Sequence, residues 1–542
     1  MTTPDVIVRN ADIRTMDGLV PKAQALAIKD GCVLALGSND DMAHARGPGT
    51  RVVDAGGRLV LPGFQDTHIH LQDGGQRFAQ TADLTRVRTV EALQKVLRDE
   101  AGKGNGWVNG GGWYSGIFSE DNLDRHVLDA AVPDRPCYIV SSDGHNACIN
   151  SLACERIGLR RGTPDPLNGQ FVRDRNGEPT GMLYESAMDW AEERMPRPSE
   201  DDFAEGVRYG QALCNRHGIT GIIDASVEER HARVYRRLDR EGGLTVRVGA
   251  TAKVHPHEGV ADAIARLSEM RAESAGDMLA IHSAKFFLDG VLENRTAAML
   301  EPYSDAAGGN APLMFDFDHM KALFAAFDAA RFQIHVHAIG DAAVRASLDG
   351  LEHARRLNGA WPSLHQIAHI QCIDPADIPR FRELGAMANI QSLWARHEPS
   401  VCDVAMPMVG SERGRLMYAF RSLIDAGASC VLSSDWGVST LNPFEIMETG
   451  VTRQPPGRPS SPVFHPEQRM TIEECVRGYT LAAAAAAWRA GGTGTLGVGK
   501  QADLIILDRD IFSCPSHEIG ATSVLLTLVS GNEVYRAGSF DG

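Results

Sequence analysis

The stretch Leu61-Pro62-Gly63-Phe64-Gln65-Asp66-Thr67-His68-Ile69-His70 decides the fold class. The apolar run 58–61 reads as a strand that ends at a Pro-Gly turn. His68 and His70 follow with one residue between them. Residues two apart in extended backbone point to the same side, and neutral imidazole is a good ligand for zinc and similar metals. The spacing therefore predicts that both rings converge on one ion.

Composition restricts the class of protein. A chain of 542 residues is too long for one compact core, so about two to four domains are expected. The net charge of -16 argues against a nucleic-acid or anionic-membrane partner, because both need a basic face. Ten scattered cysteines without a CxxC pair fit a reducing compartment. The first residues lack the features of a signal peptide, and the apolar run 481–488 is too short to span a bilayer. We therefore expect a cytoplasmic enzyme that acts on a small molecule.

Both ends of the chain predict β structure. Short apolar or alternating runs lie at 6–13, 25–28 and 32–36, and again at 502–507 and 523–529. Each set alone would expose strand edges and half a core. We therefore expect residues 1–60 and 491–542 to pair into one discontinuous β-sandwich, with the rest of the chain inserted between them.

The middle of the chain alternates strands with stretches that suit helices. After the HxH strand, apolar runs lie at 221–224, 245–249, 280–287, 332–337, 366–369, 386–390 and 430–435. Eight such units are the number that closes a (β/α)₈ barrel, whose active site lies at the carboxyl ends of the strands. We therefore predict an α/β fold with a TIM-like barrel over residues 61–490.

One gap between the predicted barrel strands is far longer than a βα loop. About 150 residues separate the first strand from the second, which predicts a subdomain inserted at about 75–210. Trp113, Tyr114, Phe118 and Trp436 either line an apolar pocket or fill a core, since aromatic residues do both. We take Trp113 and Trp436 as the candidate substrate contacts.

Histidines, a lysine and an aspartate recur at the ends of the predicted barrel strands. They are His68, His70, Lys285, His337, His369 and Asp435. Each has a simpler alternative when it is taken alone: Asp435 could cap the following helix, and Lys285 could pair with Asp289. Chance placement of one histidine at a strand end is common, whereas placement of four with an aspartate is not. Together they predict a metal site.

Two of these histidines have a competitor on the same strand. His335 lies on the same face as His337, but His337 is preferred because a loop begins immediately after it, whereas His335 would lie a layer deeper in the barrel. His365 competes with His369 from the opposite end of its strand.

The same motifs resemble the amidohydrolase superfamily, and within it the YtcJ-like branch that includes N-substituted formamide deformylases. The matching segments are 61–70, Lys285-Phe286-Phe287-Leu288-Asp289-Gly290, His337-Ala338-Ile339-Gly340-Asp341, His369, Ser434-Asp435-Trp436, Asp143-Gly144-His145 with Asn150-Ser151, and 497–504. The resemblance covers nearly the whole chain. Ser433 stands where glycine usually precedes Ser-Asp, and Ala368 stands where an acidic residue is frequent.

The resemblance implies roles for these residues. His68, His70 and Asp435 would hold a first divalent metal, which we expect to be zinc, although such ligands also accept manganese, iron or cobalt. His337 and His369 would hold a second, and Lys285 would bridge the two as a carbamate. The competing arrangement has one metal and an unmodified lysine.

The implied reaction is hydrolysis of a C–N bond in an amide, such as an N-formyl or N-acyl amine. Asp435 would move the proton, and His145 would either hydrogen-bond the substrate or cap its own loop. A deaminase or an ester or lactone hydrolase is the alternative. Deaminases of this superfamily usually carry HxxE, however, and Ala338-Ile339-Gly340 follows His337. A non-catalytic binding protein is the alternative from another class. We expect a homodimer, the commonest assembly.

Overall fold

The computed structural model describes residues 3–103, 106–113, 123–142, 144, 146–167, 169–196, 198–305 and 308–542. The chain divides into two compact units. Unit 1 comprises Met1–Ile69, Gln211–Asp435 and Leu441–Gly542, and unit 2 comprises His70–Gly210 and Trp436–Thr440. Every helix among the described residues is too short or too polar to cross a membrane.

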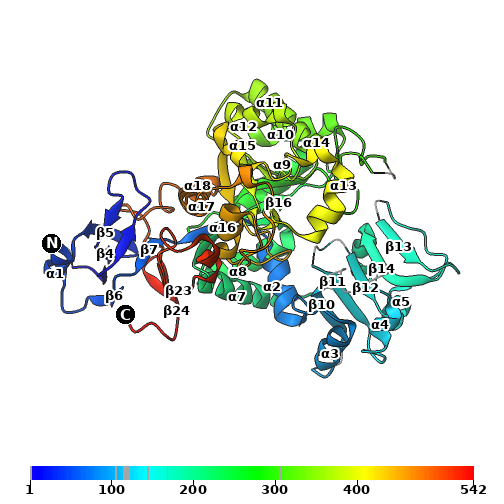
Figure 1. Cartoon of the computed structure of the whole chain (residues 1–542), viewed down its shortest axis with the longest axis horizontal. Helices are drawn as coiled ribbons and strands as arrows, with labels where there is room; N and C mark the ends of the chain where they lie inside the picture. Colours follow the sequence, from blue (N-terminus) through cyan, green and yellow to red (C-terminus); the bar gives the residue numbers. More distant parts are fainter. Residues whose placement is uncertain are drawn as a thin grey trace. The chain divides into compact units, whose positions relative to one another are not determined.

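Unit 1 contains an eight-stranded parallel sheet that curls into a nearly closed barrel (Figure 1). In spatial order its strands are β8 (Phe64–Ile69), β15 (Ile219–Val227), β16 (Arg247–Lys253), β17 (Leu279–Phe287), β18 (Gln333–Ala338), β19 (Gln366–His369), β20 (Met387–Ile390) and β21 (Ser429–Leu432). The two end strands come together where Thr67 Oγ1 of β8 donates a hydrogen bond of 3.1 Å to the Leu432 carbonyl of β21. The predicted α/β fold with eight parallel strands is confirmed.

Helices follow the barrel strands, as the alternating pattern predicts. They include α8 (Glu229–Arg240), α9 (Val260–Ala272), α10 (Phe317–Ala329), α11 (Asp341–Asn358), α12 (Ile378–Leu384), α15 (Phe420–Asp425), α16 (Pro443–Thr452), α17 (Ile472–Tyr479) and α18 (Leu481–Ala486). The buried residues of α11 show how such a helix covers the sheet: Val344, Leu348 and Leu351 recur at helical spacing and are buried.

The apolar run before the HxH motif is not part of the barrel. It forms β7 (Leu59–Pro62), which pairs with β2 (Asp12–Arg14) and β22 (Leu504–Leu507), and the barrel strand β8 begins only after Gly63. A methyl group at Gly63 would overlap the side chain of Thr220, so this close crossing between the two sheets requires glycine.

Two further sheets of unit 1 contain the ends of the chain. The six-stranded sheet has the order β24-β23-β22-β7-β2-β3, in which β3 is Lys22–Ala23. Red β23 (Val524–Val529) and β24 (Asn532–Arg536) therefore share a sheet with blue β7 in Figure 1. The four-stranded sheet has the order β5-β4-β1-β6, and its strands are β1 (Val6–Arg9), β4 (Ala25–Lys29), β5 (Cys32–Gly37) and β6 (Arg51–Asp54). One apolar core joins both sheets, with Val8 and Leu26 from one and Ile506 and Leu526 from the other.

Unit 2 contains a six-stranded mixed sheet of order β13-β14-β12-β11-β10-β9. Four of its strands are β9 (Ala82–Asp83), β12 (Asn146–Ile149), β13 (Gly169–Arg173) and β14 (Pro179–Glu185). Its helices are α2 (Leu71–Gln80), α3 (Val90–Ala101), α4 (Arg125–Asp129), α5 (Ser151–Ile157) and α6 (Ser186–Glu192). Strands β10 (Val108–Trp113) and β11 (Cys137–Ser141) pair in parallel. Side chains of β11 alternate between two apolar cores, with Cys137 and Ile139 in one and Tyr138 and Val140 in the other. Both faces of this sheet are therefore covered.

Candidate metal centre

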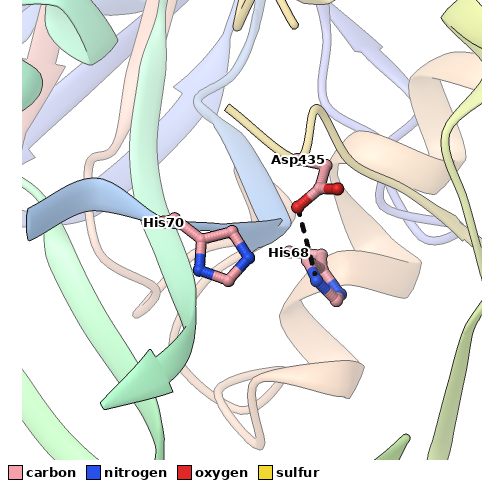
Figure 2. Close-up of side chains that lie close together, drawn as sticks. All are labelled: His68, His70 and Asp435. Carbon is pink, nitrogen blue, oxygen red and sulfur yellow. Dashed lines mark ion pairs between the residues drawn. The ribbon is translucent and has the colours of Figure 1, made fainter. Parts of the chain in front are cut away.

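The HxH histidines meet the aspartate predicted at the end of the last barrel strand. One ligand atom from each of His68, His70 and Asp435 lies within 4.8 Å of the other two, and Figure 2 shows the three side chains converging. His68 is a buried residue near the carboxyl end of β8, and its Nε2 lies 3.5 Å from Oδ1 of Asp435. The main-chain N–H of Asp435 donates a 2.8 Å hydrogen bond to the carbonyl of His68, which fixes the two segments side by side.

A second carboxylate, that of Asp66, holds this junction together. Its Oδ1 accepts hydrogen bonds from the main-chain N–H of His68 at 3.2 Å and of Ser434 at 3.1 Å. Burial raises the pKa of Asp66 to about 7. Asp66 lies in the opening motif, yet its spacing gives no sign that it connects β8 to the segment carrying Asp435.

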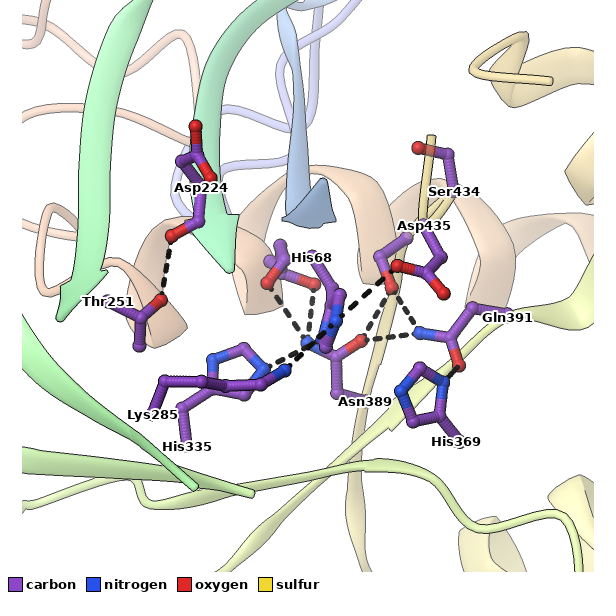
Figure 3. Close-up of polar contacts among 12 residues, drawn as sticks. His68, Asp224, Thr251, Lys285, His335, His369, Asn389, Gln391, Ser434 and Asp435 are labelled. Carbon is purple, nitrogen blue, oxygen red and sulfur yellow. Dashed lines mark hydrogen bonds and ion pairs between the residues drawn. The ribbon is translucent and has the colours of Figure 1, made fainter. Parts of the chain in front are cut away.

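Lys285 lies inside the barrel against the first histidine. It is fully buried on β17, and its Nζ lies 3.3 Å from Nε2 of His68 (Figure 3). Burial is the main cause that lowers the pKa of Lys285 to about 7. The carboxylate of Asp289, the alternative partner considered above, accepts main-chain hydrogen bonds from Ala298, Ile339 and Gly340.

The two histidines of β18 lie in different places. His335 is the deeper one, and its Nε2 lies 2.8 Å from Nδ1 of His68 (Figure 3). His337 is near the strand end, where its Nε2 lies 3.2 Å from the Gly290 carbonyl and its ring lies 4.4 Å from that of His369. His335 therefore contacts a predicted ligand, whereas His337 packs beside one.

His369 ends β19 with a left-handed backbone, at a φ of 77°. Its Nδ1 lies 2.8 Å from Oε1 of Gln391, its ring stacks on Trp394 at 5.6 Å, and its centroid lies 4.9 Å from that of His68. The competing His365 hydrogen-bonds Asp328 at 3.0 Å and the main-chain N–H of Ile334, and thus has structural partners.

The remaining predicted site residues belong to unit 2. Trp113 is fully buried in the apolar core at the end of β10, and Trp436 stacks on Phe78 with centroids 5.5 Å apart. His145 lies outside the described residues, as do Tyr114 and Phe118.

The donor set fits a divalent cation. Imidazole nitrogens and a carboxylate oxygen are the ligands of zinc and related metals. The carboxylate of Asp435 is nearly buried, and a buried charge requires a partner of opposite sign. Two residues that sequence reasoning did not single out, Gln391 and Asp66, hold the predicted ligands in place. Gln391 directly follows a predicted strand, so the strand-end rule could have found it.

Imidazoles, a lysine and a carboxylate lie together at the carboxyl end of this parallel barrel. This is the arrangement of a barrel hydrolase that uses a metal. The model of the Amidohydrolase family matches residues 51–535, and the chain belongs to that family. This family membership, together with a structural likeness to a metal-dependent hydrolase from Pyrococcus furiosus, identifies the protein as a metal-dependent hydrolase.

Curated relatives resemble the chain over nearly its whole length. "Protein LONG AFTER FAR-RED 3" of Arabidopsis thaliana is 29% identical over 98% of this chain and 91% of its own. "Putative amidohydrolase YtcJ" of Bacillus subtilis is 27% identical over 95% and 96%, and "N-substituted formamide deformylase" of Arthrobacter pascens is 28% identical over 99% of each chain. The resemblance seen in the sequence motifs is confirmed. Among solved structures, an uncharacterized metal-dependent hydrolase from Pyrococcus furiosus has a TM-score of 0.74 and 25% identity, over 94% of this chain and 100% of its own.

Proposed function

We propose that this protein hydrolyses the C–N bond of an amide, with an N-formyl or N-acyl amine of apolar substituent as substrate. The observation that carries the proposal is the convergence of His68, His70 and Asp435 at the carboxyl end of the barrel. The similarity to N-substituted formamide deformylase along the full chain supports this substrate class.

We propose that His68, His70 and Asp435 hold a first metal ion and that His337 and His369 hold a second, with zinc as the ion. The short distance between the rings of His337 and His369 supports a shared ligand. The chemistry that a divalent cation would supply there is polarisation of the substrate carbonyl and a lower pKa for nearby water.

Asp435 is the proposed proton carrier. Its carboxylate accepts a proton from the attacking water as the new O–C bond forms, and then gives that proton to the nitrogen as the C–N bond breaks. The products are a carboxylic acid and an amine. The position of its Oδ1, 3.5 Å from Nε2 of His68, supports this role. We propose that His145 hydrogen-bonds the substrate and that Trp436 contacts its apolar substituent, whereas Trp113, buried in an apolar core, has a packing role.

Lys285 is proposed to carry a carbamate. The step requires a neutral amine: the Nζ–C bond to carbon dioxide forms and one proton is released. Burial, which lowers the pKa of Lys285 to about 7, supports a neutral amine at neutral pH. A carbamate would add an anionic metal ligand beside His68. An unmodified Lys285 with a single metal is the competing form.

The test is metal content by elemental analysis of protein purified without chelator, combined with turnover of a panel of N-formyl and N-acyl amines. An ester, a lactone and an aminopyrimidine serve as the substrates of the competing activities. Two zinc equivalents with amide turnover support the proposal, and one equivalent points to the unmodified lysine. Protein that takes up no metal on reconstitution contradicts it and favours a non-catalytic relative.

The predicted domain arrangement is also a proposal. It places a discontinuous β-sandwich at 1–60 and 491–542, a barrel at 61–490 and an inserted subdomain at about 75–210. The apolar core common to the two terminal sheets supports the sandwich. The homodimer and the cytoplasmic location are proposals from the sequence alone.

A further inference from the structure

Four side-chain amides form a hydrogen-bonded ladder inside the barrel. Gln333 lies on β18, Gln366 on β19, Asn389 on β20, and Gln391 directly after β20. All four are buried, and the bonds between them lead to His369 (Figure 3 shows the upper part). An amide has a donor end and an acceptor end, so the ladder has a direction.

The lower end of the ladder is anchored on the main chain. One terminal atom of Gln333 lies 2.8 Å from the Leu364 carbonyl and 2.8 Å from the Ala486 carbonyl. Carbonyl oxygens only accept hydrogen bonds, so that atom is the nitrogen. The oxygen of Gln333 therefore faces Gln366, whose nitrogen lies 2.9 Å from it.

The anchored orientation of Gln333 determines which terminal atom of each following amide is the oxygen and which is the nitrogen. The oxygen of Gln366 accepts from Nδ2 of Asn389 at 2.8 Å, and the same nitrogen also donates to the Thr67 carbonyl at 3.1 Å. This second carbonyl anchors the ladder independently. The oxygen of Asn389 then faces Nε2 of Gln391, at 3.2 Å.

At the upper end the ladder determines where His369 carries its proton. Nε2 of Gln391 donates to Asn389 and to Oγ of Ser433, so Oε1 of Gln391 is the atom 2.8 Å from Nδ1 of His369. Because an amide oxygen only accepts, Nδ1 of the ring carries the hydrogen. A neutral ring protonated at Nδ1 keeps its lone pair on Nε2, and such a nitrogen can bind a metal.

We propose that Gln391 is a positioning residue that, through this amide ladder, holds His369 as the Nδ1–H tautomer with Nε2 ready to ligate. The inference rests on the proposed metal role of His369. Packing alone does not explain the arrangement, because apolar side chains of similar size would fill the barrel without the cost of burying four amides. Ser433, which replaces the usual glycine, gives the Gln391 amide a further acceptor.

The test compares three variants with the parent. Gln391→Leu removes the acceptor, and Gln391→Glu restores an acceptor toward Nδ1. Gln468→Leu is the matched control, because Gln468 is a buried amide whose partner is Ser422 rather than a predicted ligand. Nitrogen NMR of metal-free protein with labelled histidine reports the tautomer of His369, whose signals are those lost in His369→Asn. Competition with a chelator reports the affinity for zinc.

We expect the parent, Gln391→Glu and Gln468→Leu to show the Nδ1–H tautomer, and Gln391→Leu to lose it. The affinity of Gln391→Leu for the second zinc equivalent should fall by about 10- to 100-fold. A parent ring protonated at Nε2, or a Gln391→Leu variant with the tautomer and affinity of the parent, overturns the inference. If the parent binds no zinc, the proposed function fails, while the tautomer still decides the role of the ladder.

Discussion

Replacement of Asp435 by asparagine separates catalysis from folding at this site. Asp435 has a left-handed backbone with a φ of 51°, a conformation that asparagine tolerates and that strains alanine. Its structural bond to the His68 carbonyl comes from the main-chain N–H, which the substitution keeps. Asp435→Asn therefore changes the charge and proton affinity of the side chain with little change of shape.

The expected loss follows from the two roles proposed for the carboxylate. Removal of a proton carrier lowers kcat by about 10²- to 10⁴-fold, or about 3 to 5 kcal/mol in activation free energy. Loss of one anionic ligand also weakens metal binding, so the assay is run at saturating zinc, with metal content measured on the same sample. Thermal unfolding of the metal-free protein serves as the folding control.

A kcat within tenfold of the parent, measured on Asp435→Asn protein that holds as much zinc as the parent, refutes the proposed role of Asp435. A large fall in the melting temperature of the metal-free variant contradicts the claim that the main-chain bond of Asp435 is enough to hold its segment beside His68. It would mean that the carboxylate itself stabilises the segment that carries Asp435. The two readouts thus test separate steps of the reasoning.

Three further predictions concern the framework of the site. Arg247 and Asp503 form a buried ion pair at 2.8 Å, so Arg247→Met should lower the free energy of unfolding by about 3 to 5 kcal/mol in urea titrations, and adding Asp503→Asn should recover part of the loss. Burial lowers the pKa of His282 to about 4, so between pH 6.5 and 4 the unfolded chain binds a proton that the folded chain does not. The free energy of unfolding should therefore decrease by up to about 3 kcal/mol as the pH is lowered from 6.5 to 4. His282→Phe should remove this part of the slope in melts across that range. A methyl group at Gly340 would overlap the Ala298 carbonyl oxygen, so Gly340→Ala should cost about 1 to 3 kcal/mol in the same titrations and should lower turnover, because Gly340 lies in the loop after His337.

The sequence could predict the barrel, the pairing of His68 with His70, and the placement of Asp435 at the same end of the barrel, because these follow from strand geometry. Alternation along a strand places residues two apart on one side, and parallel strands bring their carboxyl ends to one edge. The strand boundary was harder to predict. Both β7 and β8 are buried throughout, and only the close crossing at Gly63 shows where one sheet ends and the other begins.

The partners of the predicted ligands could not be derived from one sequence. Asp66 and Gln391 act through hydrogen bonds to segments that are remote in the chain, and no spacing rule connects residue 66 to 434 or 391 to 369. The left-handed backbone of His369 turns its ring in a direction that strand alternation does not predict. Such contacts depend on the packing of the whole barrel.

Strand β18 shows that the partners of a side chain depend on its level along the barrel axis and on the neighbouring strands. Gln333, His335 and His337 lie two residues apart and so share one face. The sequence ranks His335 and His337 by depth, but it does not show which residues each of them contacts. In the barrel they occupy successive levels: Gln333 anchors the amide ladder, His335 contacts His68, and His337 packs against His369. The identity of each partner depends on how neighbouring strands are staggered, because the residue opposite in register is Gln366 for His335 and Ala368 for His337. A polar residue on a barrel strand is therefore best interpreted together with the residues opposite it on the neighbouring strands. For a histidine, the donor or acceptor character of those partners indicates which ring nitrogen can bind a metal.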